Sequence, residues 1–569
     1  MLRKGYSLWL VILFLLSQKA NASQYAFQIT FTDKNNTPFS LSTPLDYLSS
    51  RAVSRRLTQG ISIDSTDLPV NSRYVDSVLT LTGGKLHGTS RWFNMCFILL
   101  SDSSQILQLA GKPFINNIKK VGYYPVNLHR PATYVTNPSS SNAILAQSPF
   151  LDEPGSAGAS YYGTAWPQTV QVRGNYLSDK GYQGQGKLIA IFDAGFIGTN
   201  VHIGFDSMWQ SGRVVDTFNF NTRTTGVFVQ AVHGTECLST IAGNLPGSFV
   251  GTAPYASFAL YVSDIEPGDQ PLELDNLVMA SERADSIGAD VITESLGYDL
   301  WDNPNDGQVF DSLDGKTTLG AKAANMATKK GILFVATAGN DGAPAIPGWG
   351  THILTPGDAD SALTIGAVDL SGNIAPFSGY GPNAALRIKP DICGMGVGTY
   401  CLNPGSSTGM TTASGTSVST PQMAGWAACL MQANPNSTPF QIRQAMIHCA
   451  SAYNNPGVQL GYGIPDFECV NNWLDVKDVS LAFSNTNWVI PSPNPFHNDL
   501  NLLVSANDNQ IASFVILNMQ GHEVYNSEAV VYSGYNTPIT LSLTNLPAGI
   551  YTLKAMSATQ YQVVKLVKE

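Results

Sequence analysis

The sequence predicts an α/β protein in which a parallel sheet carries helices on both faces, preceded by a small α+β domain and followed by a small all-β sandwich. Residues 161–475 contain near-continuous apolar runs, typical of strands buried on both faces: Leu188–Phe192, Ser257–Val262, Val291–Ser295, Ile332–Ala336 and Leu363–Val368. Helical patterns alternate with these runs, as in layered α/β folds: Glu236–Ile241, Leu274–Ile287, Gly320–Lys329, Pro421–Gln432 and Pro439–Cys449. Residues 496–569 show only strand-like alternation, which predicts the sandwich.

The domain borders follow from the composition of the chain. Tyr25–Phe31 alternates like a strand and Leu48–Leu57 is a basic helical stretch, which together indicate an α+β front domain. Ser, Pro, Gly, Asn and Ala dominate residues 137–160, and Asn, Ser and Pro dominate 484–495, as in linkers. We therefore expect five segments: an export signal at 1–22, the front domain with its linker at 23–153, the α/β domain at 154–477, a linker at 478–495 and the sandwich at 496–569.

The first 22 residues have the three parts of a secretory signal peptide. Arg3 and Lys4 precede an apolar run, Leu8–Leu16, and Ala20–Ala22 supplies small residues for cleavage. A membrane anchor is the alternative, but the run is shorter than the roughly 20 residues that a spanning helix needs. The sequence predicts export and no membrane span in the mature chain.

Charge argues against a nucleic-acid partner. The 569 residues carry 31 Lys and Arg against 41 Asp and Glu, a net charge of −10, and an acidic surface repels phosphate backbones. The charge is uneven: residues 23–153 hold eleven basic and eight acidic side chains, and residues 154–569 hold 17 and 33. A mildly basic front domain thus precedes an acidic body, and the two could form a complementary pair.

Seven cysteines in an exported chain can form disulfides. The short-range pairs, Cys393–Cys401 and Cys449–Cys469, are the ones we expect, although spacing alone leaves the connectivity open. Cys237 and Cys429 lie in apolar helical runs, where buried free thiols are at least as well supported.

Two residues in the α/β segment have the chemistry of a base and its positioning group. His233 stands where a helix starts, and Asp193 ends an apolar strand, where its carboxylate can orient an imidazole and stabilise its cation. Each also has a structural reading: His233 as a packed residue, Asp193 as a turn former. Of the other histidines in this segment, His448 is expected to be a packed helix residue, and His202 and His352 to lie in loops.

Ser417 and Asn340 have the chemistry of a nucleophile and an oxyanion donor. Ser417 lies in a small-residue turn that opens a long apolar helix, with Pro421 expected in its early turns, so backbone amides favour negative charge there. Asn340 follows an apolar strand and can donate its amide to an oxyanion. The alternatives are a helix cap for Ser417 and an ordinary Asn-Asp-Gly turn for Asn340.

Taken together, the chain order Asp193, His233, Asn340, Ser417 resembles the subtilisin-like serine proteases. The motif Gly-Thr-Ser-Val-Ser-Thr-Pro at Gly415–Pro421 is its most specific part, and the resemblance covers roughly residues 160–470. The departures are modest: Ala194, Val418-Ser419 and Gln422 replace a hydroxyl residue, Met-Ala and His, and none of them removes a catalytic group.

The resemblance implies a role for each residue. Ser417 would be the nucleophile, His233 the general base and then acid, and Asp193 the group that orients His233. Asn340 and the Ser417 amide would form the oxyanion hole. The edge segment Ser295, Leu296 and Gly297 would pair with the substrate backbone. Cys237, four residues after His233, resembles the thiol of one branch of the family and implies sensitivity to mercurials.

The flanking domains carry resemblances of their own. The front domain occupies the place of a subtilase propeptide, which would assist folding and block the cleft; a permanently attached domain is the alternative. The tail, with Pro493–Phe496, Leu546–Tyr551 and Lys565–Lys568, resembles type IX secretion sorting domains of certain Gram-negative bacteria; a carbohydrate-binding or adhesive sandwich is the alternative. These likenesses imply export by the signal peptide through the periplasm and outer membrane to the cell surface or medium, with the chain's own propeptide and the type IX machinery as partners.

The sequence thus predicts a secreted serine endopeptidase that acts on proteins or peptides through an acyl-enzyme and needs no cofactor for catalysis. Structural calcium is a candidate at loop Asp299–Gly307, which holds oxygen ligands, although a solvated acidic loop is the better-supported reading. The competing hypotheses are a catalytically silent surface binding protein on the same scaffold, and an esterase or transpeptidase with the same triad.

Overall fold

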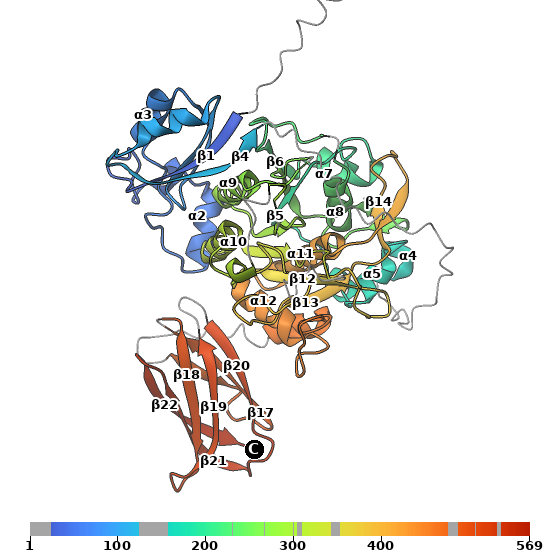
Figure 1. Cartoon of the computed structure of the whole chain (residues 1–569). Helices are drawn as coiled ribbons and strands as arrows, with labels where there is room; N and C mark the ends of the chain where they lie inside the picture. The colour runs from blue at the N-terminus through green and yellow to red at the C-terminus, as the bar shows by residue number, and fades with distance from the viewer. Residues whose placement is uncertain are drawn as a thin grey trace, which may run out of the picture.

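The computed structural model describes residues 24–124, 158–229, 231–266, 268–299, 301–303, 310–342, 353–475, 488–506, 508–531 and 536–569. The expected signal peptide and most of the expected linkers lie outside these ranges. Figure 1 shows a front domain in blue, a large α/β domain, and a red β-domain at the end of the chain. This is the predicted fold class.

A seven-stranded sheet, parallel throughout, forms the centre of the α/β domain, in the order β13-β12-β11-β10-β5-β9-β6. Its strands are β5 (Leu188–Asp193), β6 (Val214–Asn219), β9 (Ser257–Val262), β10 (Val291–Glu294), β11 (Leu333–Thr337), β12 (Leu363–Val368) and β13 (Ile392–Met395). The five apolar runs are confirmed as strands. The two edge strands, β6 and β13, were not predicted, because β6 is half exposed and polar and β13 is only four residues long.

Helices cover both faces of this sheet, and the pleat decides which strand residue faces which layer. Ile189 and Ile191 of β5 pack with α8 (His233–Ala242), α11 (Thr416–Ala433) and α12 (Pro439–His448). Ala190 and Phe192 face the opposite layer, α9 (Leu272–Ile287) and α10 (Leu319–Lys329). All five predicted helices are therefore present. The domain also contains helix α13 (Phe467–Asp475) and four short helical segments: α4 (Ala159–Tyr162), α5 (Trp166–Val170), α6 (Asn175–Asp179) and α7 (Asp206–Gln210). Two small hairpins complete it: β7 (Asn244–Leu245) with β8 (Phe249–Val250), and β14 (Thr399–Leu402) with β15 (Met410–Ala413).

The front domain is a four-stranded antiparallel sheet with its own core, in the order β2-β3-β1-β4. Its strands are β1 (Gln24–Phe31), β2 (Lys85–Ser90), β3 (Met95–Leu100) and β4 (Ile115–Tyr124), and its helices are α2 (Ser50–Thr58) and α3 (Ser72–Thr82). The predicted strand and basic helix of this domain are confirmed as β1 and α2. Helix α9 contacts α2, β2 and β4, so the front domain lies against the α9 side of the large sheet (Figure 1).

The tail consists of two antiparallel sheets around a separate core. One contains β16 (Val489–Ser492), β17 (Asp499–Ser505) and β20 (Asn536–Ser542); the other contains β18 (Gln510–Leu517), β19 (Glu523–Val531), β21 (Gly549–Met556) and β22 (Tyr561–Lys568). Strand β16 lies within the residues expected to be linker. Its Pro491 suggested a linker, but β16 is an edge strand, where proline is tolerated.

The cysteines correct one of the two expected disulfides. Cys449 and Cys469 are bonded, joining the end of α12 to α13. Cys393 and Cys401 are instead free and buried, on β13 and β14. Short spacing along the chain was therefore not sufficient to predict a bond between Cys393 and Cys401. Cys237 and Cys429 are buried free thiols, as expected.

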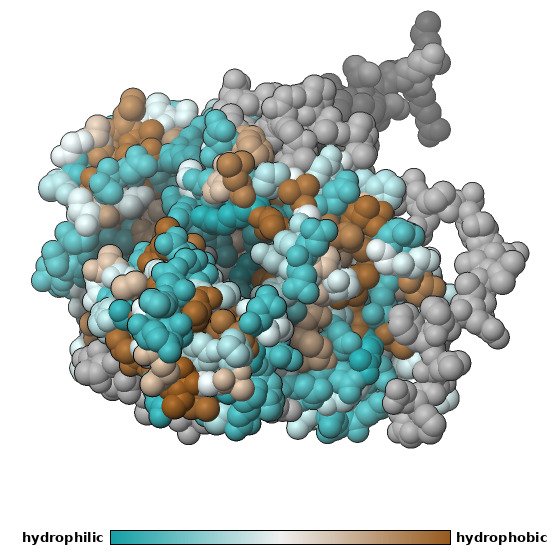
Figure 2. Space-filling model, turned by 90° about the horizontal axis from the view of Figure 1, so that it is seen from below, coloured by the Kyte–Doolittle hydropathy of each residue, from teal (hydrophilic) through white to brown (hydrophobic). Residues whose placement is uncertain are grey.

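No described helix combines the length and apolar character needed to cross a bilayer. On the face seen in Figure 2, hydrophobic residues are scattered in small groups among hydrophilic ones.

Candidate active site

Asp193 and His233 meet at the carboxyl edge of the sheet, one at the last residue of β5 and the other at the first residue of α8. The Nδ1 atom of His233 lies 2.9 Å from Oδ1 and 3.1 Å from Oδ2 of Asp193. Gly234 makes this approach feasible, because a Cβ there would lie 2.3 Å from the Gly195 carbonyl oxygen and 2.8 Å from the Asp193 Cβ. The carboxylate is fully buried, whereas 16% of the imidazole is exposed. The ring therefore presents Nε2 away from the carboxylate.

The electrostatic environment favours the imidazolium form of His233. Burial, the largest single influence, would lower the pKa of His233, but the charge of Asp193, the nearby Cys237 and the hydrogen bonds to both together outweigh it, and the pKa is raised well above 6.5. A histidine held in this way is a stronger base than a free one.

Ser417 is the second residue of α11, and Pro421 explains how it is held. Helix α11 starts at Thr416, so Pro421 lies in its second turn, one of the early turns expected, but past the first turn, where a missing N–H costs least. Proline has no N–H to donate to the residue four positions earlier, so the Ser417 carbonyl accepts from side chains instead. It receives the Ser295 hydroxyl at 2.9 Å and the Cys237 thiol at 3.2 Å. Because the helical hydrogen bond is missing, the Ser417 carbonyl is free to bond to Ser295, just after β10, and to Cys237 on α8.

Asn340 and Gly415 complete the surroundings of the Ser417 hydroxyl. The Oδ1 atom of Asn340 accepts from the backbone N–H of Thr416 at 2.9 Å and from its hydroxyl at 3.1 Å, which leaves Nδ2 facing Gly415. A Cβ built on Gly415 would lie 2.7 Å from Ser417 Oγ, 3.5 Å from Asn340 Nδ2 and 3.6 Å from the Ser417 backbone nitrogen. One small space therefore adjoins a hydroxyl and two N–H donors, an arrangement suited to an oxyanion.

Ser295, Leu296 and Gly297 follow directly after β10, at the same edge of the sheet. Ser295 is buried and holds the Ser417 carbonyl as described above, a contact that sequence reasoning missed. Hydrogen bonds thus join Asp193 to His233, Ser295 to Ser417 and Asn340 to Thr416, the residue before Ser417. Leu296 and Gly297 follow Ser295 directly in the chain.

Cys237 lies between the histidine and the serine. Its Sγ is 3.9 Å from both ring nitrogens of His233, and burial raises the pKa of its thiol. Among the described residues, the only group of three His, Cys or acidic side chains close enough to share a metal ion is Asp193, His233 and Cys237.

The calcium expected at loop 299–307 stays a prediction. Residues 300 and 304–307 lie outside the described ranges, and the Asp302 carboxylate accepts the backbone N–H of Asp269 at 3.2 Å. No described group of three acidic, His or Cys side chains includes this loop. Calcium enters no step of the chemistry below.

The other two described histidines of the α/β domain, His202 and His448, have structural surroundings. His448 ends α12 and packs against the rings of Tyr453 and Trp473. His202 accepts the backbone N–H of Gly204 and contacts the Gly409 carbonyl. His352 lies outside the described residues.

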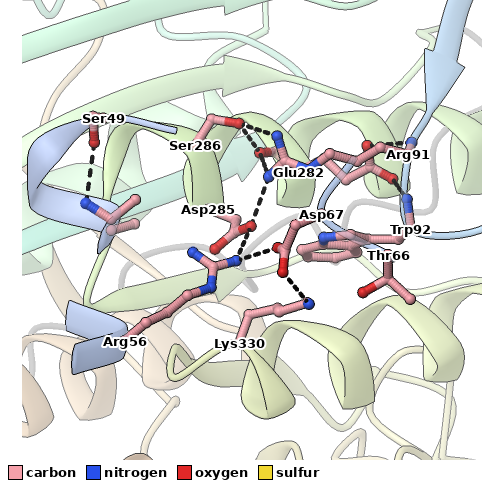
Figure 3. A network of polar contacts seen from close by, with 12 residues as sticks. Ser49, Arg56, Thr66, Asp67, Arg91, Trp92, Glu282, Asp285, Ser286 and Lys330 are labelled. Carbon is pink, nitrogen blue, oxygen red and sulfur yellow. Dashed lines mark hydrogen bonds and ion pairs between the residues drawn. The ribbon is translucent and has the colours of Figure 1, made fainter. Parts of the chain in front are cut away.

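A buried ionic cluster joins the front domain to α9 (Figure 3). Asp285 of α9 receives guanidinium groups from Arg55 at 2.5 Å, Arg91 at 2.6 Å and Arg56 at 2.9 Å. Burial would raise the pKa of Asp285, but these three cations lower it below its usual value. Glu282, one turn earlier, accepts the backbone N–H of Arg91 at 2.8 Å.

The same cluster extends to α10. Asp67 of the front domain accepts from Arg56 at 2.7 Å and from Lys330, at the end of α10, at 2.8 Å (Figure 3). The Arg56 and Lys330 side chains are each 1% exposed. Charges buried this deeply are tolerated only when they are paired, so the front domain and the α9–α10 layer depend on each other for neutralisation.

Comparison with known proteins agrees with this geometry. Family models match as Subtilase family over residues 184–464, as Peptidase S8 propeptide domain of Bacteroidota over 26–137, and as Secretion system C-terminal sorting domain over 492–569. Subtilisin BL of Lederbergia lenta is 32% identical over 237 residues, 42% of this chain and 76% of that protein. Subtilisin DY of Bacillus licheniformis is 28% identical over 296 residues, 51% of this chain and 92% of that protein.

The chain belongs to the subtilase family of serine proteases. It carries a propeptide domain in front and a type IX sorting domain behind, and the sorting domain indicates secretion or a cell-surface location. The resemblances of the three domains to a subtilase, a propeptide and a sorting domain are confirmed.

Proposed function

We propose that the protein is a secreted endopeptidase that cleaves peptide bonds through an acyl-enzyme formed on Ser417. The observation that carries this proposal is the space beside Gly415, which adjoins the Ser417 hydroxyl and two N–H donors. The Ser417 Oγ attacks the substrate carbonyl carbon, and His233 Nε2 takes the hydroxyl proton, because Nδ1 is held by Asp193. The resulting oxyanion accepts from Asn340 Nδ2 and the Ser417 N–H.

The remaining steps return the enzyme to its starting state. The His233 imidazolium gives its proton to the leaving amine, which breaks the peptide bond and leaves the acyl group on Ser417. Water then enters, His233 takes its proton, and the ester is hydrolysed by the same route in reverse. The edge segment Ser295–Gly297 aligns the substrate backbone by strand pairing, which accepts many sequences.

We further propose that the front domain is the chain's own inhibitory propeptide and that the tail directs export through the periplasm and outer membrane. The buried ionic cluster on α9 supports the first proposal, because it forms a specific interface with the front domain in which opposite charges are paired. The family match of the tail supports the second.

The test compares wild type with Ser417→Ala, both expressed as residues 23–569. The expected result is that wild type cleaves casein and loses its front domain, whereas the variant does neither, as followed by activity and intact mass. Equal cleavage by both proteins, or a well-folded wild type that cleaves nothing, would favour the silent binding protein. A wild type that turns over esters or acyl-acceptor amines faster than any peptide amide would favour the esterase or transpeptidase.

A further inference from the structure

The space between Gly297 and Gly339, which we call the acyl slot, is where the side chain of the attacked substrate residue must go. Gly297 ends the edge segment after β10, and Gly339 precedes Asn340 after the adjacent strand β11. A substrate residue that pairs with the first segment and offers its carbonyl oxygen to Asn340 lies across both. Its side chain therefore projects between the two glycines.

Leu354 already occupies the acyl slot. A Cβ on Gly297 would lie 2.7 Å from the Leu354 Cβ and 2.8 Å from its Cδ1, and a Cβ on Gly339 would lie 2.6 Å from its Cγ and 2.7 Å from its Cδ1. The same methyl group thus lies where a side chain on either glycine would have to go, and Leu354 as a whole is 7% exposed.

The backbone beside Leu354 is fixed to both sides of the slot. The Leu354 N–H donates to the Ala338 carbonyl at 3.4 Å, and Thr355 exchanges two hydrogen bonds with Tyr298, at 2.9 and 3.1 Å. The Thr355 hydroxyl is in turn bonded to that of Thr318, the N-cap of α10, at 2.6 Å. Leu354 therefore cannot leave the slot without breaking contacts to three elements.

We propose that Leu354 is a specificity-determining residue that restricts cleavage to peptide bonds following Gly, Ala or Ser. Larger acyl-side residues, such as Leu or Phe, would have to occupy the volume that the Leu354 side chain fills. This inference rests on the proposed function, because it assumes that Ser417 attacks a substrate aligned as described.

The test uses peptide p-nitroanilides that are identical except for Ala, Leu or Phe at the acyl-side residue. The enzyme is expressed as the full chain and assayed after it has lost its front domain. We expect wild type to prefer the Ala substrate over the Phe substrate in kcat/KM. In Leu354→Ala, the ratio of kcat/KM for the Phe substrate to kcat/KM for the Ala substrate should rise about 10- to 200-fold. This is the range of discrimination that one methylene group in a hydrophobic pocket provides. Ile353→Ala, which removes a buried side chain of equal size from the same segment, is the control and should leave the Ala-to-Phe ratio unchanged.

Three outcomes decide the inference. A wild type that prefers Phe or Leu over Ala overturns it, and so does a folded Leu354→Ala with an unchanged ratio. If the variant does not fold, the sites at which wild type cuts casein decide, because cleavage mainly after large residues also overturns it. Failure of the proposed function looks different: no substrate is cleaved, or cleavage persists in Ser417→Ala.

Discussion

At the residue scale, the ion pair between His233 and Asp193 should set the pH dependence of hydrolysis. The base must be neutral to accept the Ser417 proton, and Asp193 raises the pKa of His233. We therefore expect kcat/KM to rise with pH through a midpoint above 6.5. In Asp193→Asn the charge is lost, so the His233 pKa should fall and the midpoint should move to lower pH, while kcat drops about 10⁴-fold because the tautomer is no longer fixed.

The measurement is the pH profile of kcat/KM for both proteins, with Ser417→Ala as the background. Glu236→Gln, which removes a carboxylate three residues along α8 from His233, is the matched control and should shift the midpoint far less. A midpoint that stays in place when Asp193 is neutralised would contradict the assignment of Asp193 as the orienting group.

Cys237 offers a second handle on the same histidine. Its buried Sγ lies 3.9 Å from both ring nitrogens of His233, so a mercury atom on sulfur would displace the ring. Stoichiometric mercurial should abolish casein hydrolysis by wild type but not by Cys237→Ala. Cys429→Ala, which removes another buried free thiol, should remain sensitive. Full activity in a protein whose Cys237 carries mercury, as verified by mass, would exclude this coupling.

At the scale of elements, the packing of the front domain against α9 depends on the Asp285 carboxylate. In Asp285→Asn the three arginines lose their shared anion while still buried, and breaking a buried pair costs about 3–5 kcal/mol. We expect this loss in urea unfolding of the uncut chain, prepared in the Ser417→Ala background. Asp290→Asn is the matched control at the same interface: its partner Arg51 is 41% exposed, and such a pair contributes about 1 kcal/mol or less. Equal losses in the two variants would mean that the cluster is not the main anchor.

Sequence patterns predicted the elements whose signal is local, and missed features that depend on contacts between distant segments. The apolar runs predicted five buried strands. Strand β6 was not predicted, because an edge strand needs no second apolar face and its residues are therefore not a continuous apolar run. The positions of Asp193 and Ser417 at the ends of elements could be predicted, since parallel strands bring their carboxyl ends to one edge. The contact of Leu354 with Gly297 and Gly339 could not, because it joins three loops far apart in the chain.

At the scale of the whole molecule, the uneven charge along the sequence has a structural counterpart. The expectation that a basic front domain complements an acidic body is met at one interface, where Arg51, Arg55, Arg56 and Arg91 face Asp285 and Asp290. Neutralising buried acids on α9 in this way would favour folding of the α/β domain while the front domain is attached. Dissociation of the front domain, rather than the cut itself, would remove these cations from Asp285.

The tail should be separable from catalysis but not from export. Its core is built only from residues 488 onward, and the site residues lie between 193 and 417. Deleting residues 488–569 should therefore leave casein hydrolysis by the purified, matured chain unchanged. In a bacterium with type IX secretion, the same deletion should hold the chain in the periplasm, because the sorting domain is missing. Immunoblots of periplasm, cell surface and medium measure this, with Ser417→Ala as the exported, inactive control. If the shortened chain reached the surface or medium as efficiently as that control, the tail would be an accessory sandwich, and export would have to be encoded in the first 487 residues.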